Sequence, residues 1–362
     1  MVDTHLGRAR LVAQGLVTRP YATPAEAVAA HGAMQGQDLP GVIASAALRT
    51  PTLDPARVIA DLDEGRLVRG YPMRGTVFLM AADDVAWVSQ LCNPAMLRAQ
   101  AARRGQLALE DDHVREASEL TASVLADEPR GLSRTALMER WQAAGIPTDG
   151  GRGYHVLSHL IGRGEVVFGP WNGVDQNIVP QSWLPAGSTL QERFNGDRVA
   201  AVAELLERYL TSHGPATLRD FAWWTKLPLK EIRAAFGQIS DRVESSGPEA
   251  EARHWRPGLW DEVAALGDRV DEPLLLPGFD EFVLGYQDRL FAMTEAQHQL
   301  LVPGNNGVFK KTMVREGLAR GMWTRAGRPG KRSLELAPFD RLTKKAAGEY
   351  EALFERFPFV GA

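Results

Sequence analysis

The sequence has few of the features that mark secreted, membrane-spanning or cysteine-rich proteins. Its single cysteine, Cys92, excludes an internal disulfide and a zinc site made of several cysteines. Its longest apolar runs, such as residues 274–276, are far shorter than the roughly 20 residues that a membrane helix needs. The N-terminus lacks a basic segment followed by an apolar one, so we expect no signal peptide. Together these absences favour a cytoplasmic protein without a membrane partner.

Lysine is absent from the first 225 residues, and the first one in the chain is Lys226. Arginine outnumbers lysine throughout the chain by 34 to 7, a bias that the codon usage of a GC-rich genome also produces. A reaction in the N-terminal half that required an amine nucleophile would therefore need a lysine from the C-terminal part.

Length and composition are those of a folded protein with more than one domain. At 362 residues the chain exceeds what one hydrophobic core usually supports, which favours two or three domains. The net charge of −4 argues against a histone-like mode of nucleic-acid binding, which depends on an overall positive charge.

Charge is unevenly distributed along the chain, and residues 305–332 form a strongly basic segment. Eight basic residues against one acid, Glu316, give the segment a local charge of +7. Apolar residues interrupted by turn residues indicate β-hairpins there. The cations either pair with acids elsewhere in the fold or contact phosphate groups, and we favour the second interpretation. The basic residues are Lys310, Lys311, Arg315, Arg320, Arg325, Arg328, Lys331 and Arg332.

The most informative segment is 34–38 (Met-Gln-Gly-Gln-Asp), which ends a helical pattern that Thr23 opens as N-cap. It brings two carboxamides and a carboxylate within four residues. An amide both donates and accepts hydrogen bonds, so Gln35 and Gln37 have the groups to orient a nucleophilic water. Asp38 has the group to accept a proton or to stabilise positive charge. The alternative is that Asp38 caps the next helix and the glutamines are solvated.

Three times along the chain, a set of helices leads into a short strand region. Each middle helix begins with a capping residue, namely Thr23, Ser133 and Thr217. Three helices closed by a two-stranded wing describe a winged helix, a variant of the helix-turn-helix. The expected helices lie near 6–17, 24–34 and 40–49, then near 112–126, 134–144 and 152–162, and finally near 197–213, 217–225 and 229–237.

We therefore predict a mainly α fold with β (α+β), made of tandem winged-helix domains and a C-terminal β-rich element. The predicted domains are winged helix 1 with a helical extension at 1–108, winged helix 2 at 109–192, winged helix 3 at 193–270, and the β-rich element with a terminal helix at 271–362.

The third helix of the second repeat, near 152–162, is the one expected to face DNA. Arg152, His155 and His159 share one of its faces because they are three and four residues apart. The two histidines have the spacing of a metal-binding pair, but the glutamate of a zinc protease and a third ligand are missing. Phosphate contact or simple solvation is the better interpretation, and we predict no metal site.

Short motifs follow one another along nearly the whole chain. They are Gln35-Gly36-Gln37, Arg74–Leu79 with Asp83-Asp84, His213–Thr217, Asp220–Trp224, Leu227-Pro228, Leu275–Asp280, Gly285-Tyr286, Asp288-Arg289 and Gly321–Trp323. In this order they resemble the AlkZ/YcaQ-type winged-helix DNA glycosylases. The resemblance implies tandem winged helices and a small β-rich element arranged around DNA. It also implies excision of alkylated bases, chiefly guanines substituted at N7, including crosslinks left by genotoxic natural products.

Members of that family use a glutamine–aliphatic–glutamine motif as the catalytic element, which falls here on Gln35 and Gln37. Gly36 stands at the aliphatic position, and Phe78 stands where members often have a histidine. An N7-alkylated guanine is cationic and leaves as a neutral base, so the enzyme need not protonate it. The resemblance thus implies that Gln35 and Gln37 hold the attacking water and that Asp38 assists as base or counter-charge.

The resemblance therefore predicts a DNA glycosylase that hydrolyses the N-glycosidic bond of N7-alkylated guanine and leaves an abasic site. Because no lysine lies near the glutamines in the sequence, we expect a monofunctional enzyme that forms no Schiff base. The alternative function is a non-catalytic winged-helix transcription regulator, which would bind a palindromic site as a dimer.

The partner expected for a glycosylase is double-stranded DNA with an alkylated purine, and the protein is expected to be a monomer near the nucleoid. No cofactor is expected. General repair of alkylation damage and self-resistance to a toxin both remain open as its biological role. The residues expected to contact DNA are Arg152, His155, His159, Lys310, Lys311, Arg315, Arg325 and Arg328.

Overall fold

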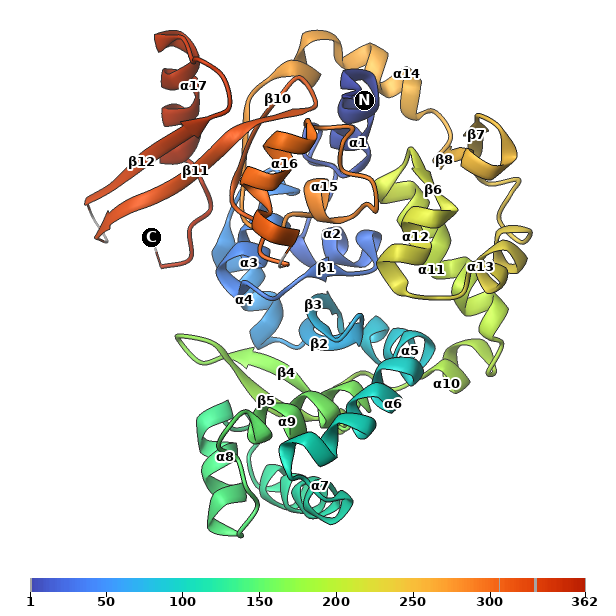
Figure 1. Ribbon diagram of the computed structural model, residues 1–362, viewed down its shortest axis with the longest axis vertical. Helices are drawn as coiled ribbons and strands as arrows, with labels where there is room; N and C mark the ends of the chain where they lie inside the picture. The colour runs from blue at the N-terminus through green and yellow to red at the C-terminus, as the bar shows by residue number, and fades with distance from the viewer. Residues whose placement is uncertain (1, 306, 329–330, 362) are drawn as a thin grey trace. The chain divides into compact units, whose positions relative to one another are not determined.

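The computed structural model describes residues 2–305, 307–328 and 331–361 (Figure 1). The chain forms two compact units. Unit 1 contains residues 1–58 and 203–362, and unit 2 contains residues 59–202. Within the described residues, no helix is both long enough and apolar enough to cross a membrane.

Unit 1 combines helices from both ends of the chain with small sheets. Its helices are α1 (Thr4–Ala13), α2 (Pro24–His31), α3 (Leu39–Leu48), the start of α4 (Pro55–Asp63), most of α11 (Arg198–His213), α12 (Leu218–Thr225), α13 (Leu229–Phe236), α14 (Leu259–Leu266), α15 (Glu281–Leu284), α16 (Glu295–Leu301) and α17 (Lys344–Glu355). Its strands are β1 (Met34–Gln35), β6 (Ala216–Thr217), β7 (Glu244–Ser246), β8 (Arg253–Trp255), β9 (Leu274–Leu276), β10 (Thr312–Arg315), β11 (Leu318–Arg328) and β12 (Lys331–Pro338).

A complete winged helix lies in unit 1. Its elements follow the order α11, β6, α12, α13, β7, β8, and its sheet has the strand order β6-β8-β7. Thr217 begins α12 as predicted, because its hydroxyl accepts from the backbone N–H of Asp220 while the Asp220 carboxylate accepts from the N–H of Thr217. The apolar side of these helices buries Tyr209, Phe221 and Trp224.

The C-terminal part of unit 1 is a four-stranded antiparallel sheet with the order β12-β11-β10-β9. β11 and β12 form the long hairpin that is red in Figure 1, with α17 beside it. Trp323 of β11 is buried against Tyr350 and Phe354 of α17, and the Tyr350 hydroxyl donates to the backbone oxygen of Val314. Burial of these aromatic rings attaches the terminal helix to the sheet.

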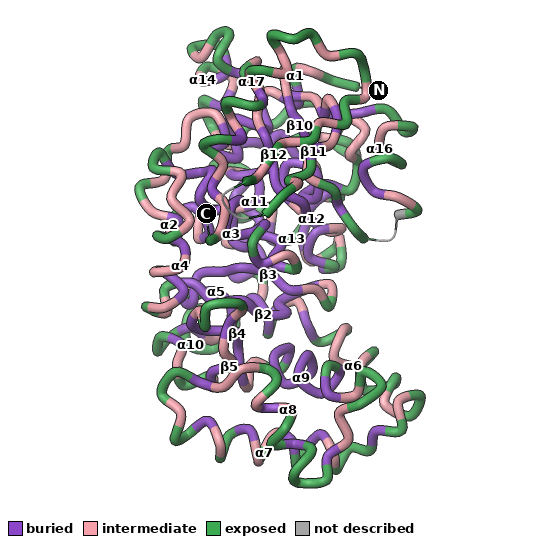
Figure 2. Tube along the Cα trace, turned by 90° about the vertical axis from the view of Figure 1, so that its left-hand side faces the viewer, coloured by how far each residue is buried: buried purple, intermediate pink, exposed green. Residues whose placement is uncertain are grey.

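Unit 2 has helices on a mainly antiparallel sheet. Its helices are the end of α4, then α5 (Ala82–Cys92), α6 (Pro94–Arg103), α7 (Asp111–Ala126), α8 (Arg134–Ala143), α9 (Arg152–Gly162), α10 (Leu190–Phe194) and the start of α11. Its strands are β2 (Leu67–Met73), β3 (Thr76–Ala81), β4 (Val166–Trp171) and β5 (Gln176–Pro180), in the spatial order β3-β2-β4-β5. β2 and β3 are buried along most of their length (Figure 2).

A second winged helix lies in unit 2. α7, α8 and α9 (green in Figure 1) precede the β4–β5 wing, and a backbone bridge joins Leu132 to Ile178 of β5. Ser133 caps α8 as predicted, accepting from the N–H of Ala136. Trp141 is buried in the centre of this domain, where its indole N–H donates to Thr121. The two winged helices and the C-terminal sheet confirm the predicted α+β fold class.

Some elements differ from the sequence-based expectation. The first helix ends at residue 13 and not 17, because Gly15 has a φ of 69°, which lies outside the helical region. Several helices were not among those expected, for example α4, α6, α14 and α16. α6 has no buried residue of its own, so it carries no apolar stripe that a sequence pattern could reveal. The order helix–strand–helix–helix–strand–strand recurs from α2 to β3, and the four-domain division stays a prediction.

Candidate functional site

The glutamine motif lies immediately after a tight helix end. α2 ends at Gly32, whose φ of 75° is in the left-handed region that favours glycine. β1 follows and contains Gln35, which is buried. Gln37 is exposed and Asp38 is half-buried. The motif therefore has one glutamine inside the fold and one on its surface.

The two glutamine side chains contact each other. Gln35 Nε2 donates to Gln37 Oε1 at 3.5 Å, a long and therefore weak hydrogen bond. Asp38 occupies the N-cap position of α3, but its carboxylate makes no capping hydrogen bond. A Cβ on Gly41 would lie 2.6 Å from Asp38 Oδ2, so glycine at this position leaves space for the carboxylate. The interpretation of Asp38 as a helix cap is therefore not supported.

A buried carboxylate, that of Glu281, holds the backbone of the motif. Its Oε1 accepts from the backbone N–H of Gln35 at 2.7 Å. Its Oε2 accepts from the indole N–H of Trp224 at 3.3 Å and lies 3.4 Å from His213 Nε2. The Glu281 residue is only 1% exposed. A buried carboxylate with partners on both oxygens fixes the position of the Gln35 backbone.

Glu281 was not among the predicted site residues. The sequence shows only a local signal, an acidic pair that directly follows the strand β9 and its Pro-Gly-Phe turn. The partner, Gln35, is 246 positions away, and no local pattern encodes that distance.

Beside Glu281 in the chain, Asp280 forms a buried ion pair with Arg49 at the end of α3. Arg49 Nη1 and Nη2 lie 3.0 and 3.2 Å from the two Asp280 oxygens, and both side chains are almost fully buried. Burial by itself raises the pKa of Asp280, but the Arg49 charge and hydrogen bonds from Arg49 and Ser45 outweigh it, so this pKa lies below its ordinary value.

The same guanidinium also sets the state of His31 at the end of α2. Burial first, and then the positive charge of Arg49, lower the pKa of His31 well below its ordinary value. His31 Nδ1 therefore donates to the backbone oxygen of Ala27 at 2.7 Å, while Nε2 accepts from Arg49 Nε at 3.2 Å. The ends of α2 and α3 and the loop before α15 thus share one buried polar network on both sides of the motif.

Lys311 brings a positive charge into the neighbourhood of the motif. Burial lowers the pKa of Lys311, the negative charge of Asp38 opposes that shift, and the charge of Arg325 adds to it. The Lys311 Nζ lies 5.1 Å from the centre of the Trp323 ring, a cation–π contact. No lysine is close to the glutamines in the sequence, but the fold brings Lys311 from the C-terminal half into interaction with Asp38.

The remaining cations of the basic segment have two different environments. Lys310, Arg325 and Arg328 are exposed on the loop before β10 and on β11. Arg315 pairs instead with Glu349 of α17, with an N–O distance of 2.5 Å. The interpretation that the cations pair with acids therefore applies to Arg315, and also to Arg320, which pairs with Glu316. Among the exposed cations, Arg325 has its guanidinium 4.8 Å from the centre of the Phe359 ring.

The helix that was expected to face DNA, α9, is covered by α6. His155 and His159 are only 7% and 5% exposed. Arg104 Nη2 donates to His159 Nε2 at 2.8 Å, and His159 Nδ1 lies 3.2 Å from the Gln100 side-chain oxygen. Burial and the Arg104 charge lower the pKa of His159 to about 4. These two histidines therefore present little surface to a phosphate, and their predicted DNA contact stays a prediction.

Arg152, at the start of α9, is only half-buried, but its guanidinium is held locally. Its Nη2 lies 2.7 Å from Asp149 Oδ1, and its Nε donates to the Asp149 backbone oxygen at 3.1 Å. The Asp149 carboxylate thus offsets the Arg152 charge locally, and the predicted DNA contact of Arg152 stays a prediction.

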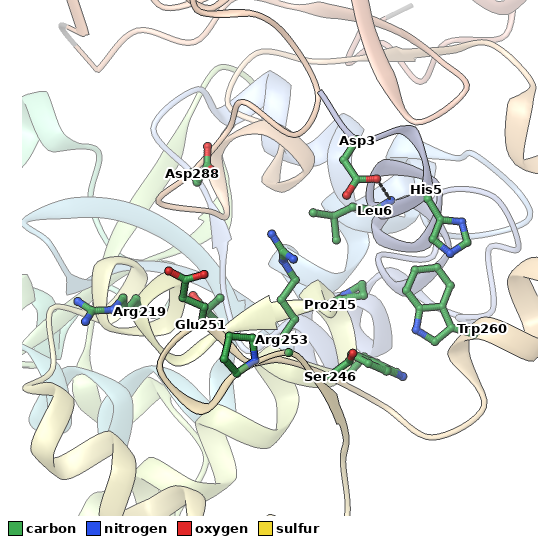
Figure 3. A pocket seen from close by; sticks show the side chains of 14 residues that line it. Asp3, His5, Leu6, Pro215, Arg219, Ser246, Glu251, Arg253, Trp260 and Asp288 are labelled. Atoms are coloured by element: carbon green, nitrogen blue, oxygen red, sulfur yellow. Dashed lines mark hydrogen bonds between the residues drawn. The ribbon is translucent and has the colours of Figure 1, made fainter. Parts of the chain in front are cut away.

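The described residues offer no metal centre, and a cavity of unit 1 lies apart from the glutamine motif. Among the described residues, no group of three or more His, Cys, Asp or Glu side chains could hold a metal ion. A cavity of about 660 Å³ in unit 1 is not lined by the glutamine motif (Figure 3). Its charged lining mixes both signs, namely Arg219, Arg253, Asp3, Glu251 and Asp288. His5 stacks on Trp260 at one wall, and Arg253 points into the space.

Comparison with known proteins assigns the chain to a family. The AlkZ-like DNA glycosylase family matches residues 28–358. The interstrand DNA cross-link repair glycosylase of Streptomyces sahachiroi is 24% identical over 290 residues, which cover 76% of this chain and 75% of the relative. The solved structure of Streptomyces sahachiroi DNA glycosylase AlkZ aligns with 99% of this chain and 97% of its own, with a TM-score of 0.72 and 20% identity, so the two share a fold. Because the family match spans nearly the whole sequence, the chain belongs to the AlkZ-like family of DNA glycosylases.

Proposed function

We propose that the protein hydrolyses the N-glycosidic bond of N7-alkylated guanine in double-stranded DNA and leaves an abasic site. The observation that carries this proposal is the contact between the Gln35 and Gln37 carboxamides. The next residue, Asp38, has a carboxylate that makes no capping hydrogen bond to α3. In a DNA glycosylase, such a group of donors and acceptors suits the positioning of one water molecule.

These residues need only position a water molecule and stabilise positive charge on the sugar, because the alkylated base leaves without being protonated. The C1′–N9 bond breaks, its electron pair moves to N9, and the positive charge of the alkylated guanine is neutralised as the base leaves. Positive charge develops at the same time on the sugar. Gln35 and Gln37 orient the water whose oxygen forms the new bond to C1′, and Asp38 stabilises the sugar cation and takes up the water proton.

The rigidity of the site supports this assignment. Water positioning requires groups that are already in place, because reorganisation during the reaction would raise the barrier. Glu281 fixes the Gln35 backbone from one side, and the Arg49–Asp280 pair fixes the end of α3. Gln37 and Asp38 are at least partly exposed and so accessible to DNA.

Within this proposal the enzyme is monofunctional, although Lys311 lies in the electrostatic neighbourhood of Asp38. The ammonium of Lys311 serves to attract a DNA phosphate and to balance the Asp38 charge. Borohydride should therefore trap no covalent enzyme–DNA adduct. An adduct that forms with the wild type and is lost in Lys311→Arg would instead make the enzyme a lyase that uses this amine.

The exposed cations are proposed to bind the DNA backbone. Each phosphate contact releases counterions, so binding weakens as salt is added. Arg325→Gln with Arg328→Gln should lower the slope of log affinity against log salt concentration by about 1 for each residue. Arg315→Gln is the matched control in the same sheet, and it should change the slope less because Glu349 already pairs with Arg315. Equal changes for all three arginines would contradict the assignment.

Base release is the direct test of the proposed function. Purified protein is incubated with a duplex that contains 7-methylguanine, and alkali then cleaves the strand at any abasic site. The wild type and Gln299→Ala should give strand scission, because Gln299 is an exposed residue whose side chain donates to Glu295 within α16. Gln37→Ala should give little or none. A second duplex with an interstrand N7–N7 crosslink tests whether the activity named for the Streptomyces sahachiroi relative extends to this chain.

No scission of either duplex by the wild type would overturn the glycosylase proposal. Sequence-specific binding by a dimer would then favour the regulator.

A further inference from the structure

Phe279 has an unusual backbone conformation beside the glutamine motif. It lies in the loop between β9 and α15, and its φ is 63°. This is the left-handed region, where a bulky side chain is disfavoured and glycine or asparagine is usual. A strained conformation of this kind persists only where the surrounding structure enforces it, and such residues gather at functional sites.

The residues on both sides of Phe279 enforce the strain. Before it, Gly278 packs so closely that a Cβ there would lie 2.7 Å from the Phe309 backbone oxygen. After it, Asp280 is held in the buried ion pair with Arg49. The loop therefore cannot relax without disturbing the network that supports the motif.

This loop also lies against the motif itself. The backbone oxygen of Gly278 is 3.2 Å from the point where a Cβ on Gly41 would stand, and that same point is 2.6 Å from Asp38 Oδ2. Phe279 thus directly follows Gly278, which contacts the first turn of α3. Its side chain is half-buried, so burial in a core does not account for a phenylalanine at this position.

The ring of Phe279 belongs to a small aromatic cluster. It lies 5.8 Å from the Phe309 ring, at 51° between the ring planes. The Arg289 guanidinium lies 4.9 Å from the Phe309 ring centre and 4.8 Å from that of Trp223. The cluster therefore already uses two of its aromatic faces to hold a cation.

We propose that the face of Phe279 contacts the cationic N7-alkylated base and makes the enzyme prefer it over a neutral purine of the same shape. This inference rests on the proposed function, since it concerns the base that the glutamine motif would release. The physical basis is the attraction between a cation and the negative face of an aromatic ring. A contact of this kind corresponds to a preference of about 2-fold where it is exposed and about 30-fold where it is desolvated.

The test measures binding to two duplexes with uncleavable lesions. One contains 7-methylguanine and the other contains 7-deaza-7-methylguanine, which has the same shape without the positive charge. Both carry a 2′-fluoroarabinose, which disfavours positive charge on the sugar and keeps the base attached. The ratio of the two dissociation constants reports the preference for the cation.

Two variants separate the role of the ring from its effect on folding. Phe279→Leu keeps an apolar side chain and the strain. Phe279→Gly removes both, so the strain that it relieves offsets part of the ring packing that it loses. Both variants should bring the ratio close to 1 while affinity for the neutral duplex changes by less than about twofold. Phe279→Tyr should keep the wild-type ratio.

A wild-type ratio near 1, or an unchanged ratio in Phe279→Leu and Phe279→Gly, would overturn this inference. Failure of the proposed function is distinguished by the separate base-release assay. If the wild type releases 7-methylguanine but the ratio does not depend on Phe279, only the role of this ring is wrong.

Discussion

Two arginines organise the two polar regions of this molecule in different ways: Arg49 in unit 1 is fully buried, and Arg104 in unit 2 is half-buried. Arg49 faces the fully buried carboxylate of Asp280, so that charge is matched inside the protein. Arg104 faces the neutral imidazole of His159 and the exposed carboxylate of Asp111. A polar cluster can therefore hold a reactive segment in place where its charges are paired internally and part of the segment stays accessible.

The accessible groups also differ between the two regions. Around Arg49, the network ends at Gln35, and the neighbouring Gln37 and Asp38 reach the surface. Around Arg104, both histidines lie under α6, and little of their surface is exposed. The first arrangement suits catalysis, whereas the second suits stability.

The largest difference is expected when each arginine is removed. Arg49→Ala leaves Asp280 buried without its counter-charge and should lower the free energy of unfolding by about 3–5 kcal/mol. Arg104→Ala leaves a neutral imidazole and a solvated carboxylate, and should cost only about 1 kcal/mol. Urea unfolding of both variants measures the two costs. Equal losses of unfolding free energy would mean that the Asp280 carboxylate is uncharged or solvated in the folded protein.

A smaller effect, on rate and not on stability, is expected for Glu281→Gln. The amide has the shape of the carboxylate, but its NH₂ group faces the indole N–H of Trp224, so the contact to the Gln35 backbone shifts. Excision of 7-methylguanine in a single turnover should slow on the order of 100-fold, since misplacement of a reacting group by about 1 Å has that cost.

DNA affinity of Glu281→Gln should stay within about threefold of the wild type, because no DNA contact is removed. Glu295→Gln, which changes an exposed carboxylate on α16, is the matched control and should leave the excision rate unchanged. A loss of affinity without a loss of rate would show that Glu281 supports DNA binding and not the glutamines.

The smallest effect concerns His159 and pH. Its folded pKa is about 4 and its unfolded pKa about 6.5, so between these values the unfolded chain binds a proton that the folded protein does not. Stability should therefore fall as the pH is lowered from 6.5 toward 4, by about 2 kcal/mol at pH 5 from this residue alone. In His159→Gln the fall should be smaller by that amount in urea unfolding at pH 7 and pH 5. An identical pH profile would mean that His159 already accepts protons in the folded state.

Local sequence signals predicted where helices begin. Thr23, Ser133 and Thr217 each cap a helix as expected, because a capping hydrogen bond spans only three residues. The glutamine motif was likewise recognisable from neighbouring residues.

The supporting contacts of the site were not predictable in the same way. The hydrogen bond from Gln35 to Glu281 joins distant parts of the chain, and so does the interaction of Asp38 with Lys311. The burial of His155 and His159 depends on α6, a helix whose own sequence lacks an apolar stripe. Residues that are expected to share an exposed helix face can therefore lie under a second helix that the sequence pattern does not predict.

Single-turnover excision by a Gln35→Ala, Gln37→Ala double variant, measured together with its DNA affinity, tests the central claim most directly. If the two carboxamides position the attacking water, the rate of 7-methylguanine release should fall by at least about 100-fold while the dissociation constant for the same duplex changes by less than about threefold. Release at the wild-type rate by a folded double variant would contradict the account.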